Sequence, residues 1–253
     1  MSGMDRILRE ELEDWERNAG FYEAELSMPY QQIIQSRISR FYSIPKGASV
    51  LDIGSGVQDG KDKVCLDISL EMIRRTKKRN PESRGVVGCA QSLPFKKESF
   101  DAVVCNGVLH HLKVQRGLQA SMAGFHHILK PRGKLYAFDR APSVLPLLLF
   151  YLRKPGKIFI KPRSTCSTRN EVAFLESDVR KITALGFRVI RRRYLVNILF
   201  QHMIMFMNLL SYLGMRRLSR RLQRMTGKVA MLTERVLAVK PLCAEQCLVL
   251  QKK

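Results

Sequence analysis

Two glycines and an aspartate in the first third of the chain have the types and spacing of a nucleotide-binding site. The stretch Val50–Ser69 reads VLDIGSGVQDGKDKVCLDIS, with a turn at Gly54 and Gly56 and a second apolar run ending in Asp67. Glycine allows positive φ and a close approach of the backbone to a ligand, and an acid ending the next strand can accept both hydroxyls of a ribose. The stretch therefore predicts a cofactor that contains a nucleoside.

The residues after Asp67 alternate between helical and strand patterns. Ser69 is a suitable N-cap for a helix that Asn80 and Pro81 would stop. Further strands are expected at 84–90, around Val103–Cys105 and at 134–139, with a helix whose core face is Leu118, Met122, Phe125 and Leu129. Strands that alternate with helices predict an α/β fold with a doubly wound, mostly parallel sheet.

The N-terminal segment has two interpretations. Residues 4–19 and 30–41 have the apolar spacing of helices, and Pro29 suits a helix start. These helices could simply pack against the edge of the sheet, or they could form a lid in which Trp15, Tyr22 or Tyr30 covers the cofactor. The chain is accordingly divided into an N-terminal helical lid (1–46), a binding core (47–140) and a C-terminal part (141–253).

Composition places the chain among reduced, globular proteins. With 253 residues, 45% hydrophobic and 26% charged, the chain can bury a full core. The N-terminus is dense in charge, so a signal peptide is not expected. The six cysteines form no C-x-x-C pair, and three lie in apolar strand-like runs, which favours buried thiols in a cytoplasmic protein over zinc or disulfides.

The net charge of +22 is concentrated in the C-terminal part. Residues 151–253 contain 22 Lys and Arg against 5 Asp and Glu. Such a field favours an anionic partner, whether a membrane surface, a nucleic acid or an acidic substrate.

Two stretches near the C-terminus predict a helical insertion between the last two strands, which are expected at 187–195 and from Glu234. Residues 194–215 contain no charged residue, but polar side chains recur on one helical face, so amphipathic helices fit better than a membrane span. Residues 215–228 then combine an apolar stripe with six basic residues, which is typical of docking on an anionic membrane. A solvated helix face is the alternative.

Four motifs carry a resemblance to a known family. VLDIGSG, VCLDIS, SLPFKKESFDAVVCNGVLHHL and HHILKPRGKLYAFD occur in the order and with nearly the spacing of class I S-adenosylmethionine-dependent methyltransferases. The chain resembles in particular the branch that includes the ubiquinone and menaquinone biosynthesis methyltransferases, clearly from about Val50 to Asp139. This resemblance implies a seven-stranded, Rossmann-like sheet, S-adenosylmethionine as cofactor and methyl transfer as activity.

The resemblance also implies a set of cofactor-binding residues. The backbone of Gly54, Ser55 and Gly56 would face the methionine part, with Asp52 near the amino group. Asp67 would hold the ribose hydroxyls, since ligands of open α/β sheets lie beyond the carboxyl ends of the strands. The other implied contacts are Ile68 on the adenine, Ala90 and Gln91 at its edge, and Asn106 and Val108 near the methyl group.

The chain departs from the family at two positions. Only seven residues, 57–63, separate Gly56 from the second strand, where relatives usually have a helix, although a parallel crossover normally needs about a dozen residues. Cys89 stands where relatives often have an acid that receives the adenine amino group. We expect binding to persist with weaker affinity or with help from the N-terminal helices.

Methyl transfer to a group that holds a proton needs a base. His110 and His111 follow the fourth strand, and His111 is the candidate catalytic base, with a structural role as its alternative. His126 and His127 lie in the middle of a helix without carboxylates at ligand spacing, so metal binding is not expected.

The resulting hypothesis is methyl transfer to a small, lipophilic acceptor by a cytoplasmic enzyme that can dock peripherally on an anionic membrane. The methylated atom, oxygen, nitrogen or carbon, is left open. The alternatives are an RNA methyltransferase that uses the basic C-terminal part, although that part lacks interleaved aromatics, and a non-catalytic binding scaffold with a degenerate methyltransferase fold.

Overall fold

The structure is a computed structural model that describes residues 3–58, 60–114, 117–140, 175–197 and 243–253, with short pieces between 206 and 222. Its elements are α1 (Gly3–Leu26), α2 (Pro29–Tyr42), β1 (Val50–Ile53), β2 (Val64–Asp67), α3 (Leu70–Arg79), β3 (Arg84–Val87), β4 (Phe100–Asn106), α4 (Leu109–Val114), α5 (Leu118–Ile128), β5 (Leu129–Arg140), α7 (Glu176–Ala184), β6 (Phe187–Asn197) and β7 (Cys243–Lys252).

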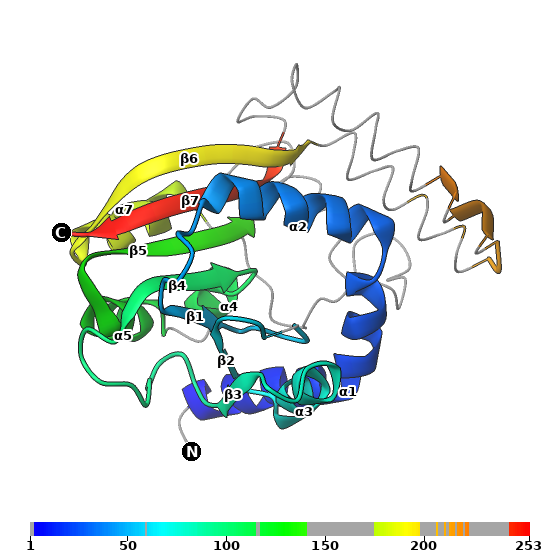
Figure 1. Ribbon diagram of the computed structural model, residues 1–253, viewed down its shortest axis with the longest axis horizontal. Helices are drawn as coiled ribbons and strands as arrows, with labels where there is room; N and C mark the ends of the chain where they lie inside the picture. Colours follow the sequence, from blue (N-terminus) through cyan, green and yellow to red (C-terminus); the bar gives the residue numbers. More distant parts are fainter. Residues whose placement is uncertain are drawn as a thin grey trace.

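One seven-stranded sheet organises the molecule, in the order β3-β2-β1-β4-β5-β7-β6 (Figure 1). β1 pairs in parallel with β2 and with β4, and β4 with β5, whereas β7 is antiparallel to both of its neighbours. The strand order reverses between β1 and β4, so the carboxyl ends of these strands border a switch point. The predicted doubly wound, mostly parallel sheet is confirmed.

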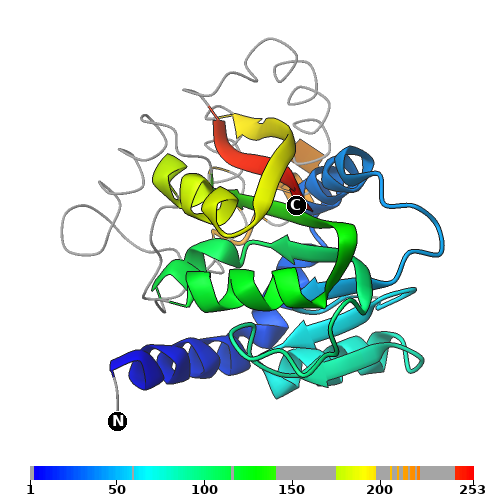
Figure 2. The ribbon, with the colours of Figure 1, turned by 90° about the vertical axis from the view of Figure 1, so that its left-hand side faces the viewer.

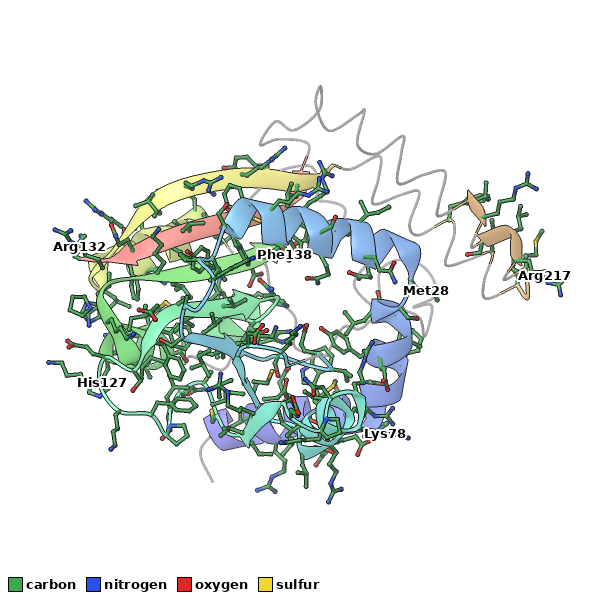
Figure 3. All side chains as sticks on the ribbon, in the orientation of Figure 1. Met28, Lys78, His127, Arg132, Phe138 and Arg217 are labelled. Atoms are coloured by element: carbon green, nitrogen blue, oxygen red, sulfur yellow. The ribbon has the colours of Figure 1, made fainter. Side chains whose placement is uncertain are left out.

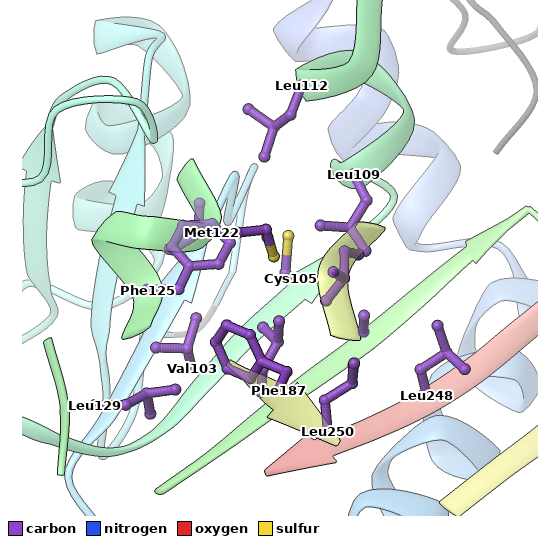
Figure 4. Close-up of a cluster of buried hydrophobic side chains, with 14 of the residues drawn as sticks. Val103, Cys105, Leu109, Leu112, Met122, Phe125, Leu129, Phe187, Leu248 and Leu250 are labelled. Carbon is purple, nitrogen blue, oxygen red and sulfur yellow. The ribbon is translucent and has the colours of Figure 1, made fainter. Parts of the chain in front are cut away.

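Alternate residues of the central strands bury two separate cores. Leu51, Val103 and Leu135 face α5 and α7, while their neighbours Val50, Val104 and Tyr136 face α2. Figure 2 shows these helices on opposite sides of the sheet, and Figure 4 shows the first core, where Phe125 and Phe187 meet the strands. Because both faces of a central strand are buried, its sequence is a continuous apolar run.

The ends of α3 follow the predicted capping. The Ser69 hydroxyl accepts a hydrogen bond from the Met72 amide at 3.1 Å, and Lys77, Lys78 and Arg79 occupy the last turn, where positive charge suits the helix dipole. The helix begins directly after β2. The chain therefore turns at Asp67 and leaves that side chain at the carboxyl edge of the sheet.

The crossover from β1 to β2 is abbreviated, as expected. The described residues between these strands form turns and no helix. The Gly60 backbone, at φ 64°, lies against Ser83, where a Cβ would come within 2.4 Å of the serine Cβ. The loop thus passes close to the connection between α3 and β3.

Two strands differ from the expected bounds. β7 is Cys243–Lys252, with residues 246–250 all buried between β5 and β6, and the strand expected from Glu234 lies outside the described residues. β5 begins at Leu129, so Pro131–Gly133 lies inside the strand, with Arg132 at φ 61° and an irregular register against β4.

The C-terminal insertion is described only in part. Phe206, Leu210, 217–219 and 221–222 are helical, 213–214 form a turn, and β6 extends into the predicted segment as far as Asn197. Most other residues of the predicted amphipathic segments lie outside the described residues, as does 141–174. Among the helices that the structure describes, none combines the length and the apolar character needed to cross a membrane.

Candidate functional site

A cavity of about 310 Å³ lies at the switch point of the sheet. Its walls come from the turn after β1, the ends of β2, β4 and β5, the start of α4, and α1. This volume falls at the lower end of the range for small-molecule sites, roughly 300–1,000 Å³. The structure therefore places a ligand-sized cavity where the glycine turn and Asp67 predicted one.

The two glycines of the turn line the cavity at places where no side chain fits. At Gly54, φ is 60° and a Cβ would lie 2.4 Å from Val108 Cγ2. At Gly56, φ is 57° and a Cβ would lie 2.4 Å from Tyr22 Cε1. Other elements thus approach this backbone closely, which only glycine permits.

Asp67 is held at the floor of the cavity by two backbone amides. Gly56 donates to Oδ2 at 2.8 Å and Ser69 donates to Oδ1 at 2.9 Å, and the residue is only 6% exposed. Burial raises the pKa of this carboxyl to about 6, against the opposing effect of the two amides. Each oxygen still has a second lone pair, so the carboxylate can accept both hydroxyls of a ribose.

Asn106 and Val108 stand at the carboxyl end of β4, beside the glycine turn. The Tyr42 hydroxyl of α2 donates to Asn106 Oδ1 at 2.5 Å. Burial raises the pKa of Tyr42 well above its usual range, so the phenol stays protonated and keeps donating. α2, which packs on one face of the sheet, therefore fixes the orientation of the Asn106 side-chain amide.

Two histidine–carboxylate pairs lie side by side at the start of α4. His110 Nδ1 is 2.9 Å from Asp139 Oδ1, at the end of β5, and its backbone amide donates to Asp139 Oδ2 at 3.2 Å. His111 Nδ1 is 3.0 Å from Glu11 Oε2 of α1. The two imidazole centroids are 4.0 Å apart, and both rings line the cavity.

The N-terminal helix forms the wall opposite the sheet. Trp15 packs its edge on His111 at 5.9 Å and on Tyr22 at 5.8 Å. Figure 1 shows α1 running beside α3, to which Arg75 ties it through an ion pair with Glu23 at 2.8 Å. Trp15 and Tyr22 line the cavity, whereas the Tyr30 side chain lies outside the described residues.

The cavity is acidic within a strongly basic protein. Its described lining contains five carboxylates and neither lysine nor arginine: Glu11, Glu25, Asp67, Asp139 and Glu245. The rest of the lining is largely apolar. Such an environment favours a ligand that carries positive charge on an apolar frame.

Most of the sequence-predicted site residues come together in this cavity: Gly54, Gly56, Asp67, Ile68, Ala90, Asn106, Val108 and His111 line it. Three predicted residues do not line the cavity. Asp52 pairs with Lys63 of the crossover at 2.5 Å. The backbone amide of the buried Ser55 donates to the Leu66 carbonyl, and Gln91 packs against Gly117.

Sequence reasoning missed the partners of the histidines. Asp139 could have been found, since it ends the strand next to β4 and parallel strands end at one edge. Glu11 gave no signal, because it is one of several acids on an exposed-looking helix. Within the described residues no group of three or more His, Cys, Asp or Glu is arranged to hold a metal ion.

These residues fit S-adenosylmethionine. Asp67 offers lone pairs for the ribose, and the glycine turn leaves backbone exposed for a close approach. The acidic lining suits the cofactor's sulfonium and ammonium groups, and the apolar Ile68 and Ala90, which line the same cavity, suit an adenine.

Comparison with known proteins gives the same family. Residues 47–137 match the model of a methyltransferase domain. A demethylmenaquinone methyltransferase of Renibacterium salmoninarum is 35% identical over 97 residues, 35% of this chain and 40% of that protein. Another, from Beutenbergia cavernae, is 31% identical over 151 residues, 53% of this chain and 59% of that protein. The matches thus span less than two thirds of these relatives.

Solved structures share the fold at low identity. An S-adenosylmethionine-dependent methyltransferase of Thermotoga maritima, described as a possible histamine N-methyltransferase, superimposes with a TM-score of 0.61 and 16% identity, covering 95% of this chain and 99% of that one. The [4+2]-cyclase SpnF gives 0.56 and 14%, covering 87% and 80%. Residues 47–137 thus match a methyltransferase domain in sequence, and the strand order gives the fold of solved S-adenosylmethionine-dependent methyltransferases.

Proposed function

We propose that this protein transfers the methyl group of S-adenosylmethionine to a small, lipophilic acceptor. One observation carries the proposal: a single cavity brings together the glycine turn, the Asp67 carboxylate and an imidazole under a helical cover. The cofactor supplies a methyl group that its sulfonium already activates. The protein's tasks are therefore to orient the reactants, exclude water and accept a proton where the acceptor holds one.

Each task has candidate residues in the cavity. The exposed backbone of Gly54 and Gly56 and the carboxylate of Asp67 orient the cofactor. Trp15 and Tyr22 exclude water from the side opposite the sheet. His111 is the base, because it lines the cavity just after the carboxyl end of β4 and its Nδ1 faces the Glu11 carboxylate.

A lipophilic acceptor is supported by the cavity and by the relatives. Apolar side chains line the part of the cavity near the histidines, including Leu8, Leu112 and Phe138. The two relatives named above act on demethylmenaquinone by their names. An acceptor that dissolves in lipid would be collected at a membrane surface.

The described part of the C-terminal insertion supports such docking. Phe206, Leu213, Met215 and Leu218 are 40–61% exposed, and Arg217 lies beside them, away from the sheet (Figure 3). Exposed apolar side chains flanked by arginines are typical of helices that lie on anionic membranes. These observations support peripheral contact with an anionic membrane.

Cofactor binding is tested through Trp15, the only tryptophan of the chain. Titration with S-adenosylmethionine should change its fluorescence saturably, and calorimetry on Trp15→Phe should still show binding. Asp67→Asn serves as the matched loss-of-binding control. An absence of binding at millimolar cofactor would favour the non-catalytic scaffold.

The acceptor is tested by incubating the protein and tritiated-methyl cofactor with cell extract, which is then split into lipid, RNA and protein fractions. Label in the lipid fraction is expected, and His111→Asn should lower it. Label in RNA alone would replace the lipophilic acceptor with the RNA alternative.

A further inference from the structure

One face of α1 reaches both the candidate base and the cofactor turn. Glu11, Trp15 and Tyr22 are four and seven residues apart, so they lie on the same side of the helix. Glu11 contacts His111, Trp15 packs on the same ring, and Tyr22 lies against Gly56. The helix thus touches the site at two separate places.

The contact between Glu11 and His111 is buried. Glu11 is 2% exposed and His111 is 7% exposed, with 3.0 Å between Oε2 and Nδ1. The orientation departs from that of a regular hydrogen bond. A carboxylate so close to Nδ1 nevertheless favours the proton on that nitrogen, which leaves the lone pair on Nε2.

The two histidine–carboxylate pairs differ in the element that supplies the carboxylate. His110 is held by Asp139, which belongs to β5 and to the sheet itself. His111 receives its carboxylate from an N-terminal helix outside residues 47–137 of the matched domain. The orientation of His110 is therefore built into the core, whereas that of His111 depends on where α1 lies.

α1 is tied to α3 by two linked ion pairs and a hydrogen bond. Arg75 binds Glu23 and Glu71, both at 2.8 Å, and the Glu71 amide donates to Glu16 Oε1 at 3.2 Å. These contacts lie at residues 16 and 23, beside the stripe that faces the cavity. They hold the helix while leaving Glu11 directed at His111.

We propose that Glu11 is a positioning residue for His111, and that α1, which also covers the cofactor turn, thereby completes the acid–base apparatus. The inference rests on the proposed function, in which His111 is the base. Glu11 acts through the imidazole and fixes which nitrogen faces the acceptor. A protein without α1 in place would have a cofactor site and a misoriented base.

The test compares Glu11→Gln with Glu13→Gln, an exposed acid of the same helix. Nitrogen-15 NMR of the full chain, without cofactor or acceptor, reports the tautomer of each histidine. In Glu11→Gln the Nε2–H form of His111 should increase while His110 stays unchanged. Methyl transfer to extract lipid, measured at saturating cofactor, should fall by about 10–100-fold, as for other orienting partners of histidine.

Two outcomes would overturn the inference. An unchanged His111 tautomer in Glu11→Gln removes its basis, and this readout needs neither cofactor nor acceptor. An altered tautomer with undiminished methyl transfer would show that His111 is not positioned for catalysis. Absence of transfer by the wild-type protein would instead overturn the proposed function, and with it any catalytic role of the pair.

A second variant guards against misfolding of Glu11→Gln. Glu11→Asp keeps the charge but shortens the side chain by one methylene, so the tautomer balance and transfer should lie between those of wild type and Glu11→Gln. Circular dichroism establishes that each variant folds. Equal behaviour of the Asp and Gln variants in both readouts would contradict a role for the carboxylate charge.

Discussion

At the scale of single residues, the glycine turn could be predicted from the sequence, but the side chains that pack against its glycines could not. The sequence indicated that Gly54 and Gly56 need positive φ, which the structure confirms. It could not show that Val108 and Tyr22 occupy the space of the missing side chains, because these contacts join distant parts of the chain. Asp67 was predictable because its place depends on the local sequence. It ends a strand, and ligands of open α/β sheets lie beyond the carboxyl ends of the strands.

Replacing Gly54 with alanine should destabilise the fold through both φ and the clash with Val108. The expected cost is about 2–4 kcal/mol of unfolding free energy in urea. Gly47→Ala has a similar φ of 80° but nothing within 4 Å, so it isolates the backbone cost. Adding Val108→Ala to Gly54→Ala should recover part of the loss, and a failure to recover would mean that the clash is not the cause.

Cofactor affinity should depend on the charge of Asp67. Its pKa is raised to about 6, so the carboxylate is ionised above that pH and protonated below it. If the ionised form binds the ribose, the apparent affinity should fall about tenfold at a pH one unit below 6. Calorimetry across this range measures the effect.

Asp67→Asn should bind weakly with a flatter pH profile. The histidines of the cavity remain in the variant, so the difference between the two profiles isolates Asp67. Parallel profiles would assign the pH dependence to another group.

At the scale of elements, helices were predictable where the apolar periodicity was strong, but the segments against which they pack were not. The N-terminal helix was expected to end near residue 19 and in fact continues to Leu26, which brings Tyr22 over the turn. The last described strand, β7, was not predicted from the sequence. Its pairing with both β5 and β6 identifies it, and that pairing joins residues far apart in sequence.

Loosening α1 from α3 should weaken the cover of the cavity. Arg75→Ala removes the ion pairs with Glu23 and Glu71, which are about one-third exposed, so the loss should be less than about 1 kcal/mol. Cofactor affinity should fall by less than about fivefold, and Trp15 emission should shift to the red. Arg74→Ala, an exposed neighbour, is the control, and equal effects of both variants would exclude a specific clamp.

At the scale of the whole molecule, charge is sharply divided. The chain has a net charge of +22, yet the described lining of the cavity is acidic. In the proposed function, the basic C-terminal part serves a surface partner and the acidic cavity serves a cationic cofactor. Charge counts along the sequence showed the first, whereas the second required folding to gather acids from α1, β2, β5 and β7.

Membrane docking should depend on the exposed apolar side chains of the insertion. Leu213→Ser with Met215→Ser should reduce flotation with vesicles of phosphatidylcholine and phosphatidylserine, because both side chains are solvent-exposed anchors. Leu70→Ser, which changes an exposed leucine on α3, should float like the wild type. Binding that is equal with and without phosphatidylserine would contradict an electrostatic contribution.

The position of β7 also has a consequence for how the protein is made. β5 and β6 emerge from the ribosome before β7, yet neither can pair with the other, since β7 fills the place between them. Until residues 243–252 are synthesised, the growing chain therefore has two open strand edges and an uncovered apolar face. We expect this half-finished sheet to be the stage at which the nascent chain most needs a chaperone.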